Sequence, residues 1–148
     1  MIAIGSDHGG VSLKNALKSF LVRRGMNFID LGTDNSDSVD YPDFGIKVAE
    51  AVASGSAENG ILICGTGIGM SIVANKVPGI RAALVTNEFM ARMSKEHNNA
   101  NILVLGGRVL DAQSACMLVG VWLDAAFEVG RHQARLDKIV AVEKKYFK

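Results

Sequence analysis

Five short apolar runs, separated by segments with helical periodicity, follow one another along the whole chain. The runs are IAIG at 2–5, NFIDL at 27–31, GILIC at 60–64, RAALV at 81–85 and NILVLG at 101–106. Such runs predict buried strands, and apolar residues that recur every three or four positions predict helices. Strands and helices in alternation form right-handed βαβ units. The sequence therefore predicts an α/β fold, with a buried five-stranded parallel sheet and helices on both faces.

Six helices are predicted between and after these runs. The first carries an apolar stripe from Leu13 to Leu21 and ends before Gly25. The second has Pro42 in its first turn and reaches about Ala53. The third is predicted through Ile72–Ala74, and the fourth over Glu88–Lys95 with Thr86 or Asn87 as its cap. The fifth is predicted after Asp111, with Ala115, Val119, Trp122 and Ala126 on one face. The sixth is predicted around Leu136, Ile139 and Val140.

Length and charge limit the kinds of protein that the chain can be. Its 148 residues fit one domain, 1–148, which buries roughly two thirds of the surface of the unfolded chain. A net charge of +1 gives no global field that would attract nucleic acid or an anionic membrane. The uncharged runs are too short to span a bilayer, and the N-terminus enters a strand without a signal peptide. A cytoplasmic protein is the simplest interpretation.

The cysteines and histidines do not form a recognisable metal motif. The two cysteines are predicted to be free thiols, because neither belongs to a C-x-x-C or zinc-ligand spacing. Cys116 lies on the apolar stripe of the fifth predicted helix, which favours packing in the core. The three histidines are far apart in the sequence and share no ligand spacing, so no metal site is predicted.

Sites in parallel α/β sheets gather at the carboxyl ends of the strands. Polar or glycine-rich residues follow three predicted strands: Ser6-Asp7-His8, Gly65–Gly69 and Gly106-Gly107-Arg108. His97 and Asn98 instead lie in the loop that enters the fifth strand, so their placement at the same edge requires an assumption about how that loop packs.

Cys64 stands directly before the glycine loop GTGIG. Loop N–H groups near a helix N-terminus favour negative charge, and the same groups would stabilise a thiolate. Cys64 is therefore a candidate base, although a small buried residue at a strand end is an equal alternative. Nucleotide binding is disfavoured, because the glycines read GxGxG and no Lys-Ser/Thr follows at P-loop spacing. Thr66 either orients a substrate or is simply a loop hydroxyl.

The other candidates are ambiguous from the sequence alone. His97 lies in the polar stretch KEHNNAN, which indicates exposure or catalysis rather than the core. Asp7 and His8 could bind a sugar hydroxyl, cap the first helix, or do both. Arg131 and Arg135 share a helical face, and such arginine pairs are commonly just exposed to solvent. With Arg108 they could bind a phosphate, but only if the fold or a second subunit brings the three side chains together.

Seven motifs, spread over nearly the whole chain, are together highly specific. They are GSDHGG at 5–10, DLGT at 30–33, DYP at 40–42, ICGTGIGMSIVANK at 63–76, EHNNAN at 96–101, GGR at 106–108 and GRHQAR at 130–135. In these motifs the chain resembles the type B ribose-5-phosphate isomerase family, which also includes galactose-6-phosphate isomerase subunits and allose-6-phosphate isomerases. One branch of that family uses a glutamate base just after the glycine loop; Met70 occupies that position here, so the chain resembles the cysteine branch.

The resemblance implies a Rossmann-like three-layer α/β/α sandwich that interconverts an aldose phosphate and a ketose phosphate without metal or other cofactor. It implies a homodimer or a dimer of dimers, with active sites between subunits. By motif match, Cys64 accepts a proton, His97 is the acid that assists ring opening, and Thr66 belongs to the catalytic loop. The residues implied to bind substrate are Asp7, His8, Gly65, Thr66, Gly67, Ile68, Gly69, Asn98, Arg108, Arg131 and Arg135.

The expected reaction is the interconversion of D-ribose 5-phosphate and D-ribulose 5-phosphate, a step of the pentose phosphate pathway. Allose 6-phosphate or galactose 6-phosphate remain alternative substrates. A non-catalytic sugar-phosphate binding module is the alternative from another class, but a pure binder would need neither the thiol nor the histidine. Thiol-based phosphatase chemistry would place phosphate in the glycine loop.

Overall fold

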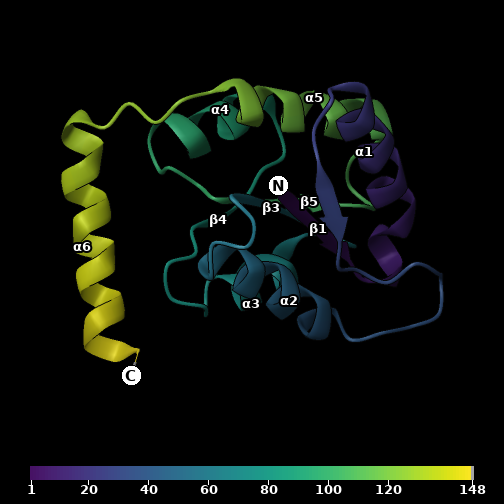
Figure 1. Cartoon of the computed structure of the whole chain (residues 1–148), viewed down its shortest axis with the longest axis horizontal. Coiled ribbons are helices and arrows are strands. Elements are labelled where there is room, and N and C mark those ends of the chain that lie inside the picture. The colour runs from purple at the N-terminus through teal and green to yellow at the C-terminus, as the bar shows by residue number, and fades with distance from the viewer. Residues whose placement is uncertain (148) are drawn as a thin grey trace.

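A five-stranded parallel sheet forms the centre of the computed structural model, which describes residues 1–147 (Figure 1). The strands are β1 (Ile2–Ser6), β2 (Phe28–Asp30), β3 (Asn59–Cys64), β4 (Ala82–Leu84) and β5 (Ile102–Gly106), in the spatial order β2-β1-β3-β5-β4. Every neighbouring pair is parallel. The α/β fold predicted from the alternating pattern is therefore confirmed, including all five strands.

Helices cover both faces of the sheet, in the three layers that the resemblance implies. They are α1 (Val11–Arg23), α2 (Tyr41–Ala53), α3 (Ile68–Ala74), α4 (Glu88–Glu96), α5 (Ala112–Asp124) and α6 (Gly130–Tyr146), and a short 3₁₀ turn, η1 (His8–Gly10), precedes α1. Asn87, not Thr86, caps α4, since its side chain accepts the N–H of Met90 at 2.9 Å. Asp111 caps α5 as predicted. The predicted face of α5 was too long, because the helix ends at Asp124 and Ala126 follows it.

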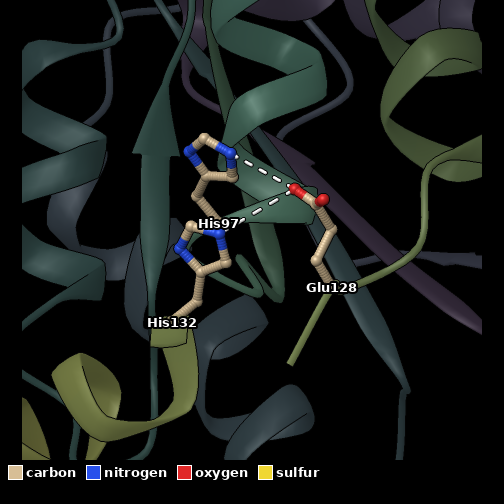
Figure 2. Close-up of side chains that lie close together, drawn as sticks. All are labelled: His97, Glu128 and His132. Atoms are coloured by element: carbon tan, nitrogen blue, oxygen red, sulfur yellow. Dashed lines mark ion pairs between the residues drawn. The ribbon is translucent and has the colours of Figure 1, made fainter. Parts of the chain in front are cut away.

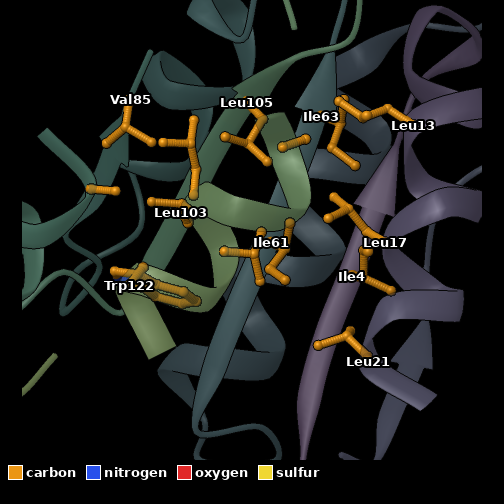
Figure 3. Packing of buried hydrophobic residues seen from close by; sticks show 14 of the residues in the cluster. Ile4, Leu13, Leu17, Leu21, Ile61, Ile63, Val85, Leu103, Leu105 and Trp122 are labelled. Carbon is orange, nitrogen blue, oxygen red and sulfur yellow. The ribbon is translucent and has the colours of Figure 1, made fainter. Parts of the chain in front are cut away.

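Alternate strand residues supply two separate cores. Ile61 and Ile63 of β3 face the layer of α1, α4 and α5, where Leu17 and Trp122 are fully buried (Figure 3). Leu62 and Cys64 face the opposite layer, against α2 and α3. This alternation follows from the two-residue period of a strand, which sends neighbouring side chains to opposite faces. The thiol of Cys64 therefore lies on the α2 and α3 side.

The strand order creates a switch point between β1 and β3. From β1 the chain crosses to β2 on one side, whereas β3, β5 and β4 lie on the other. Loops that leave two adjacent strands in opposite directions open a crevice at the carboxyl ends of those strands, where α/β proteins bind ligands. Ser6 pairs in register with Ile63, so Asp7 and Cys64 come next to each other at this switch point.

Helix α6 stands apart from the layers, beyond the β4 edge, and the segment 125–129 connects it to α5 (Figure 1). It touches the rest of the chain through a few contacts, among them the carboxylate of Glu143, which accepts the N–H of Gly79 at 3.2 Å. Leu136 is buried, but Ile139, Val140 and Val142 are 41–56% exposed. Within residues 1–147, no helix combines the length and apolar character needed to cross a bilayer.

Candidate active site

Cys64 ends β3 with its side chain enclosed and its sulfur hydrogen-bonded. The residue is 5% exposed, and the backbone N–H of Gly67 donates to its Sγ at 3.2 Å. An N–H donor aimed at sulfur stabilises the thiolate more than the thiol, because the charged form accepts the stronger bond. The N–H of Gly67 is therefore placed to stabilise negative charge on this sulfur.

Gly67 is the residue that makes this contact possible. Its φ of 83° is left-handed, and a Cβ at this position would lie 2.5 Å from Cδ1 of Leu84. Glycine alone avoids both the strain and the clash. The next turn is α3, whose first N–H groups have no intrahelical carbonyl to bond. The hydroxyl of Thr66 accepts the N–H of Ile68 at 3.2 Å, so Thr66 shapes the start of that helix.

Arg108 brings positive charge to the same loop. Its backbone N–H donates to the carbonyl of Gly65 at 2.9 Å, and its guanidinium lies over Gly65, where a Cβ would come 3.3 Å from Nη1. The N–H of Gly107 donates to the carbonyl of Cys64 at 2.7 Å. These bonds fix the segment after β5 against the glycine loop, and they leave the exposed Arg108 side chain beside Gly65.

Asp7 and His8 complete this edge from the side of β1. Asp7 is buried, and its carboxylate accepts the N–H of Gly9 at 2.9 Å, so it caps η1. Nδ1 of His8 accepts the N–H of Val39 at 3.1 Å, which leaves Nε2 as the nitrogen that carries a proton in the neutral ring. Tyr41, which the sequence analysis did not select, packs its ring against Gly69, where a Cβ would lie 2.5 Å away. In the sequence, the only feature that pointed to Tyr41 was its place in the DYP motif at 40–42.

We call this group the thiol half-site. It consists of Asp7, His8, Tyr41, Cys64, Gly65, Thr66, Gly67, Ile68, Gly69 and Arg108.

A second group of polar side chains gathers near the start of α6 (Figure 2). Oε1 of Glu128 lies 3.3 Å from Nε2 of His97 and 3.9 Å from Nε2 of His132. The two imidazole rings stack, with centroids 4.1 Å apart and planes 15° from parallel. Arg131 and Arg135 project from the same end of α6 and are exposed. With Asn98, these residues form what we call the histidine half-site. The sequence analysis missed Glu128 and His132, although both lie in or beside GRHQAR.

The three donors of this group raise the question of a metal ion. His97, Glu128 and His132 each place one ligand atom within 4.8 Å of the others, so two histidines that are distant in sequence are neighbours in space. An imidazole binds a metal along the nitrogen lone pair, which lies in the ring plane. Because the two rings are stacked, an ion shared by both nitrogens would lie between the planes and outside each of them. Arg131 and Arg135 also bring positive charge, so the arrangement suits an anion better than a cation.

Burial and neighbouring positive charge act on His132. Burial, followed by His97 and Arg131, lowers the pKa of His132 below its usual value, and the carboxylate of Glu128 opposes that change. The ring of His132 is therefore neutral at physiological pH.

The two half-sites lie at opposite ends of the strands, the thiol half-site at the carboxyl ends and the histidine half-site at the amino ends. Nζ of Lys95, near the end of α4, donates to the side chain of Asn59 at the start of β3, whereas Cys64 ends that strand. With about 3.3 Å per residue, β3 separates its two ends by roughly 16 Å. That exceeds the length of a five-carbon sugar phosphate. His97 and Asn98 are thus far from Cys64 within one chain, and Arg131 and Arg135 lie with them.

A hydrogen-bonded thiol and an arginine beside a glycine loop, at a topological switch point, indicate an α/β protein that binds a small anion. Comparison with known proteins identifies the family within this class. The model of the ribose/galactose isomerase family matches residues 2–139. The ribose-5-phosphate isomerase B of Escherichia coli is 47% identical over 144 residues, which cover 97% of each chain.

Solved structures agree with this assignment. The ribose-5-phosphate isomerase B of Clostridium thermocellum superposes with a TM-score of 0.97 at 61% identity, over 98% of both chains. The enzyme of Mycoplasma genitalium, solved with bound ribulose-5-phosphate, gives a TM-score of 0.93 at 44% identity, over 97% of this chain and 96% of that one. The chain belongs to the ribose/galactose isomerase family and is a sugar-phosphate aldose–ketose isomerase.

Proposed function

We propose that the whole chain, 1–148, acts as one isomerase domain that interconverts D-ribose 5-phosphate and D-ribulose 5-phosphate, with Cys64 as the base. In the open-chain aldose, the thiolate takes the proton from C2, the electron pair of that bond forms the C1–C2 double bond, and the π pair of the C1 carbonyl moves onto O1 to give an enediolate. The proton returns to C1, while the hydroxyl proton moves from O2 to O1. The observation that carries this proposal is the buried Cys64, whose Sγ accepts the N–H of Gly67 at the switch point between β1 and β3.

The glycine loop contributes charge stabilisation. The enediolate oxygen needs donors that are already in place, and one such donor contributes about 2.7–4 kcal/mol in comparable oxyanion sites. The loop Gly65–Gly69 would hold this charge, with Asp7 and His8 binding the sugar hydroxyls.

His97 is proposed as the acid that opens the sugar ring. It gives a proton to the ring oxygen as the bond from C1 to that oxygen breaks, and the C1 hydroxyl then loses its proton to water. His97 is 37% exposed at the end of α4, so a substrate can reach it. Asn98 beside it is exposed as well and would contact the sugar.

A second copy of the chain is needed to bring this acid to the base. Since the thiol half-site and the histidine half-site are separated by the length of β3, one chain cannot place both on one sugar. We propose a homodimer, or a dimer of dimers, in which the histidine half-site of one subunit completes the thiol half-site of its partner. The exposed apolar side chains on α6 support this, because they suit an interface.

Phosphate binding is assigned to three arginines from both half-sites. Arg108 lies over Gly65, and Arg131 and Arg135 would join it from the other subunit. Guanidinium groups are suited to a phosphate dianion, because they donate two parallel hydrogen bonds. A cytoplasmic location is part of the proposal, since a charged sugar phosphate does not diffuse through a bilayer.

Hydrogen exchange tests the reaction. The wild-type protein should exchange the transferred hydrogen of ribulose 5-phosphate for deuterium in D₂O, and the Cys64→Ala variant should not. Binding without any exchange would instead identify a sugar-phosphate binding module, and release of inorganic phosphate would identify a phosphatase. Turnover of ribose 5-phosphate, allose 6-phosphate and galactose 6-phosphate, measured side by side, decides which sugar is preferred.

A further inference from the structure

One carboxylate oxygen faces both histidines of the histidine half-site. Three elements supply these side chains: His97 follows α4, Glu128 lies in the segment 125–129, and His132 is in the first turn of α6 (Figure 2). Oε1 of Glu128 is nearer to His97, at 3.3 Å, than to His132, at 3.9 Å. The shorter distance is that of an ion pair and falls just beyond the usual range for an N–H···O hydrogen bond.

The backbone around Glu128 is arranged to hold this contact. Its N–H donates to the carbonyl of Glu96 at 3.0 Å, which fastens the segment to the end of α4. Val129 then adopts a φ of 60°, a left-handed conformation that is unfavourable for a β-branched residue. Such strain persists only where the surrounding structure enforces it. Val129 is the residue directly before α6, so its conformation helps to set the direction of that helix and the place of His132 in its first turn.

The stack accommodates one positive charge. Two imidazolium rings with centroids 4.1 Å apart would repel each other. Arg131 and Arg135 on α6 add to the positive potential, and burial and these neighbours lower the pKa of His132. Glu128 opposes the effect of the arginines and lies nearer to His97. His97 is therefore the ring on which Glu128 acts at the shorter distance, and it is also the more exposed, at 37% against 8%.

We propose that Glu128 and His132 are positioning residues for His97. Glu128 accepts the Nε2–H of the His97 imidazolium, and the neutral ring of His132 fixes the plane of that ring. Nδ1 of His97 is then the nitrogen that delivers a proton to the ring oxygen of the substrate. This inference rests on the ring-opening role proposed for His97.

A comparison of two substrates tests the kinetic part. Ribose 5-phosphate is mostly cyclic, whereas ribulose 5-phosphate has no ring, because its 5-hydroxyl is phosphorylated. Glu128→Gln should lower kcat/KM for ribose 5-phosphate by about tenfold, which is part of the 10²–10⁴-fold that a general acid contributes. The same variant should change the rate of deuterium exchange into ribulose 5-phosphate by less than about twofold. Glu88→Gln, which removes an exposed carboxylate from the other end of α4, is the matched control and should change neither rate.

An NMR titration of His132 tests the arrangement without reference to catalysis. His97→Asn should raise the pKa of His132, because the neighbour that lowers it is gone, and Glu128→Gln should lower that pKa further. An unchanged His132 titration in both variants would overturn the inference even if the enzyme is an isomerase. Equal losses on the cyclic and the ring-free substrate would overturn it as well. So would Zn²⁺ binding that needs both histidines and Glu128, because it would identify a metal site instead.

Discussion

The thiol half-site and the histidine half-site are built in different ways. In the first, strand ends and glycine turns place the groups, and the central side chain, Cys64, is buried and bonded by Gly67. In the second, side chains from a helix end and a separate helix meet at the surface, and Glu128 is 51% exposed. In the proposed mechanism, one chain by itself thus holds the base and the anion loop in place, whereas the acid and two arginines reach them only from a second chain.

The largest effect is expected from the thiol half-site. Cys64→Ala removes the proposed base but leaves the loop amides and Arg108, so kcat should fall by about 10²–10⁴-fold with little change in substrate affinity. Cys64→Ser should not restore activity, because a hydroxyl is too weak an acid to ionise at neutral pH. Steady-state kinetics with ribose 5-phosphate measure this. Near wild-type turnover in Cys64→Ala would remove the thiol from the mechanism.

The second prediction tests whether the half-sites work across subunits. Cys64→Ala and His97→Ala should each be inactive alone. After they are unfolded together and refolded, half of the dimers are mixed, and each mixed dimer holds one intact site, so activity should return to about a quarter of wild type.

A mixture of Cys64→Ala with Arg108→Ala is the matched control for that experiment. Both changes fall in the thiol half-site, so no mixed dimer has an intact site, and activity should not rise above the mean of the two parent variants. Recovery in this control, or none in the first mixture, would contradict a shared active site.

Phosphate recognition should give a smaller effect. Arg135→Ala removes one charge-assisted contact, so KM for ribose 5-phosphate should rise by about tenfold or more, whereas kinetics with any free sugar that the enzyme accepts should change little. Lys144→Ala, which removes a positive charge from the last turn of the same helix, should leave KM unchanged. Equal losses on phosphorylated and free sugar would show that Arg135 does not bind the phosphate.

The smallest expected effect concerns stability. Gly67→Ala forces a side chain into a left-handed conformation and against Leu84, so the free energy of unfolding should fall by about 1–3 kcal/mol. Arg131→Ala, at an exposed position of the histidine half-site, should change it by less than about 0.5 kcal/mol. Urea unfolding at one fixed protein concentration compares the two. A similar loss in both would mean that the half-sites do not differ in rigidity.

The sequence predicts the thiol half-site well because its geometry is local. Strand periodicity places Asp7 and Cys64 at carboxyl ends, and the glycine spacing marks the turn that follows. The register of β1 against β3 then makes the two residues neighbours, as any parallel sheet with this order would.

The histidine half-site was less predictable because its contacts are not local. The stack of His97 and His132 depends on the direction of α6, which the strained backbone of Val129 sets. A left-handed valine has no sequence signature, so periodicity predicts the helix but not its place. The exposed face of α6 also gave no signal, since Ile139 and Val140 look like core residues in the sequence yet lie at the surface of the single chain.

The placement of the two half-sites at opposite ends of the strands would also make the catalytic rate depend on protein concentration. If each active site needs two chains, a lone chain has every functional residue and still cannot turn over substrate. Specific activity should then fall when the enzyme is diluted below the dissociation constant of its dimer, and substrate, which touches both chains, should oppose that dissociation. The separation of acid and base by one strand length would thus make the amount of enzyme in a cell a control on the activity of each molecule.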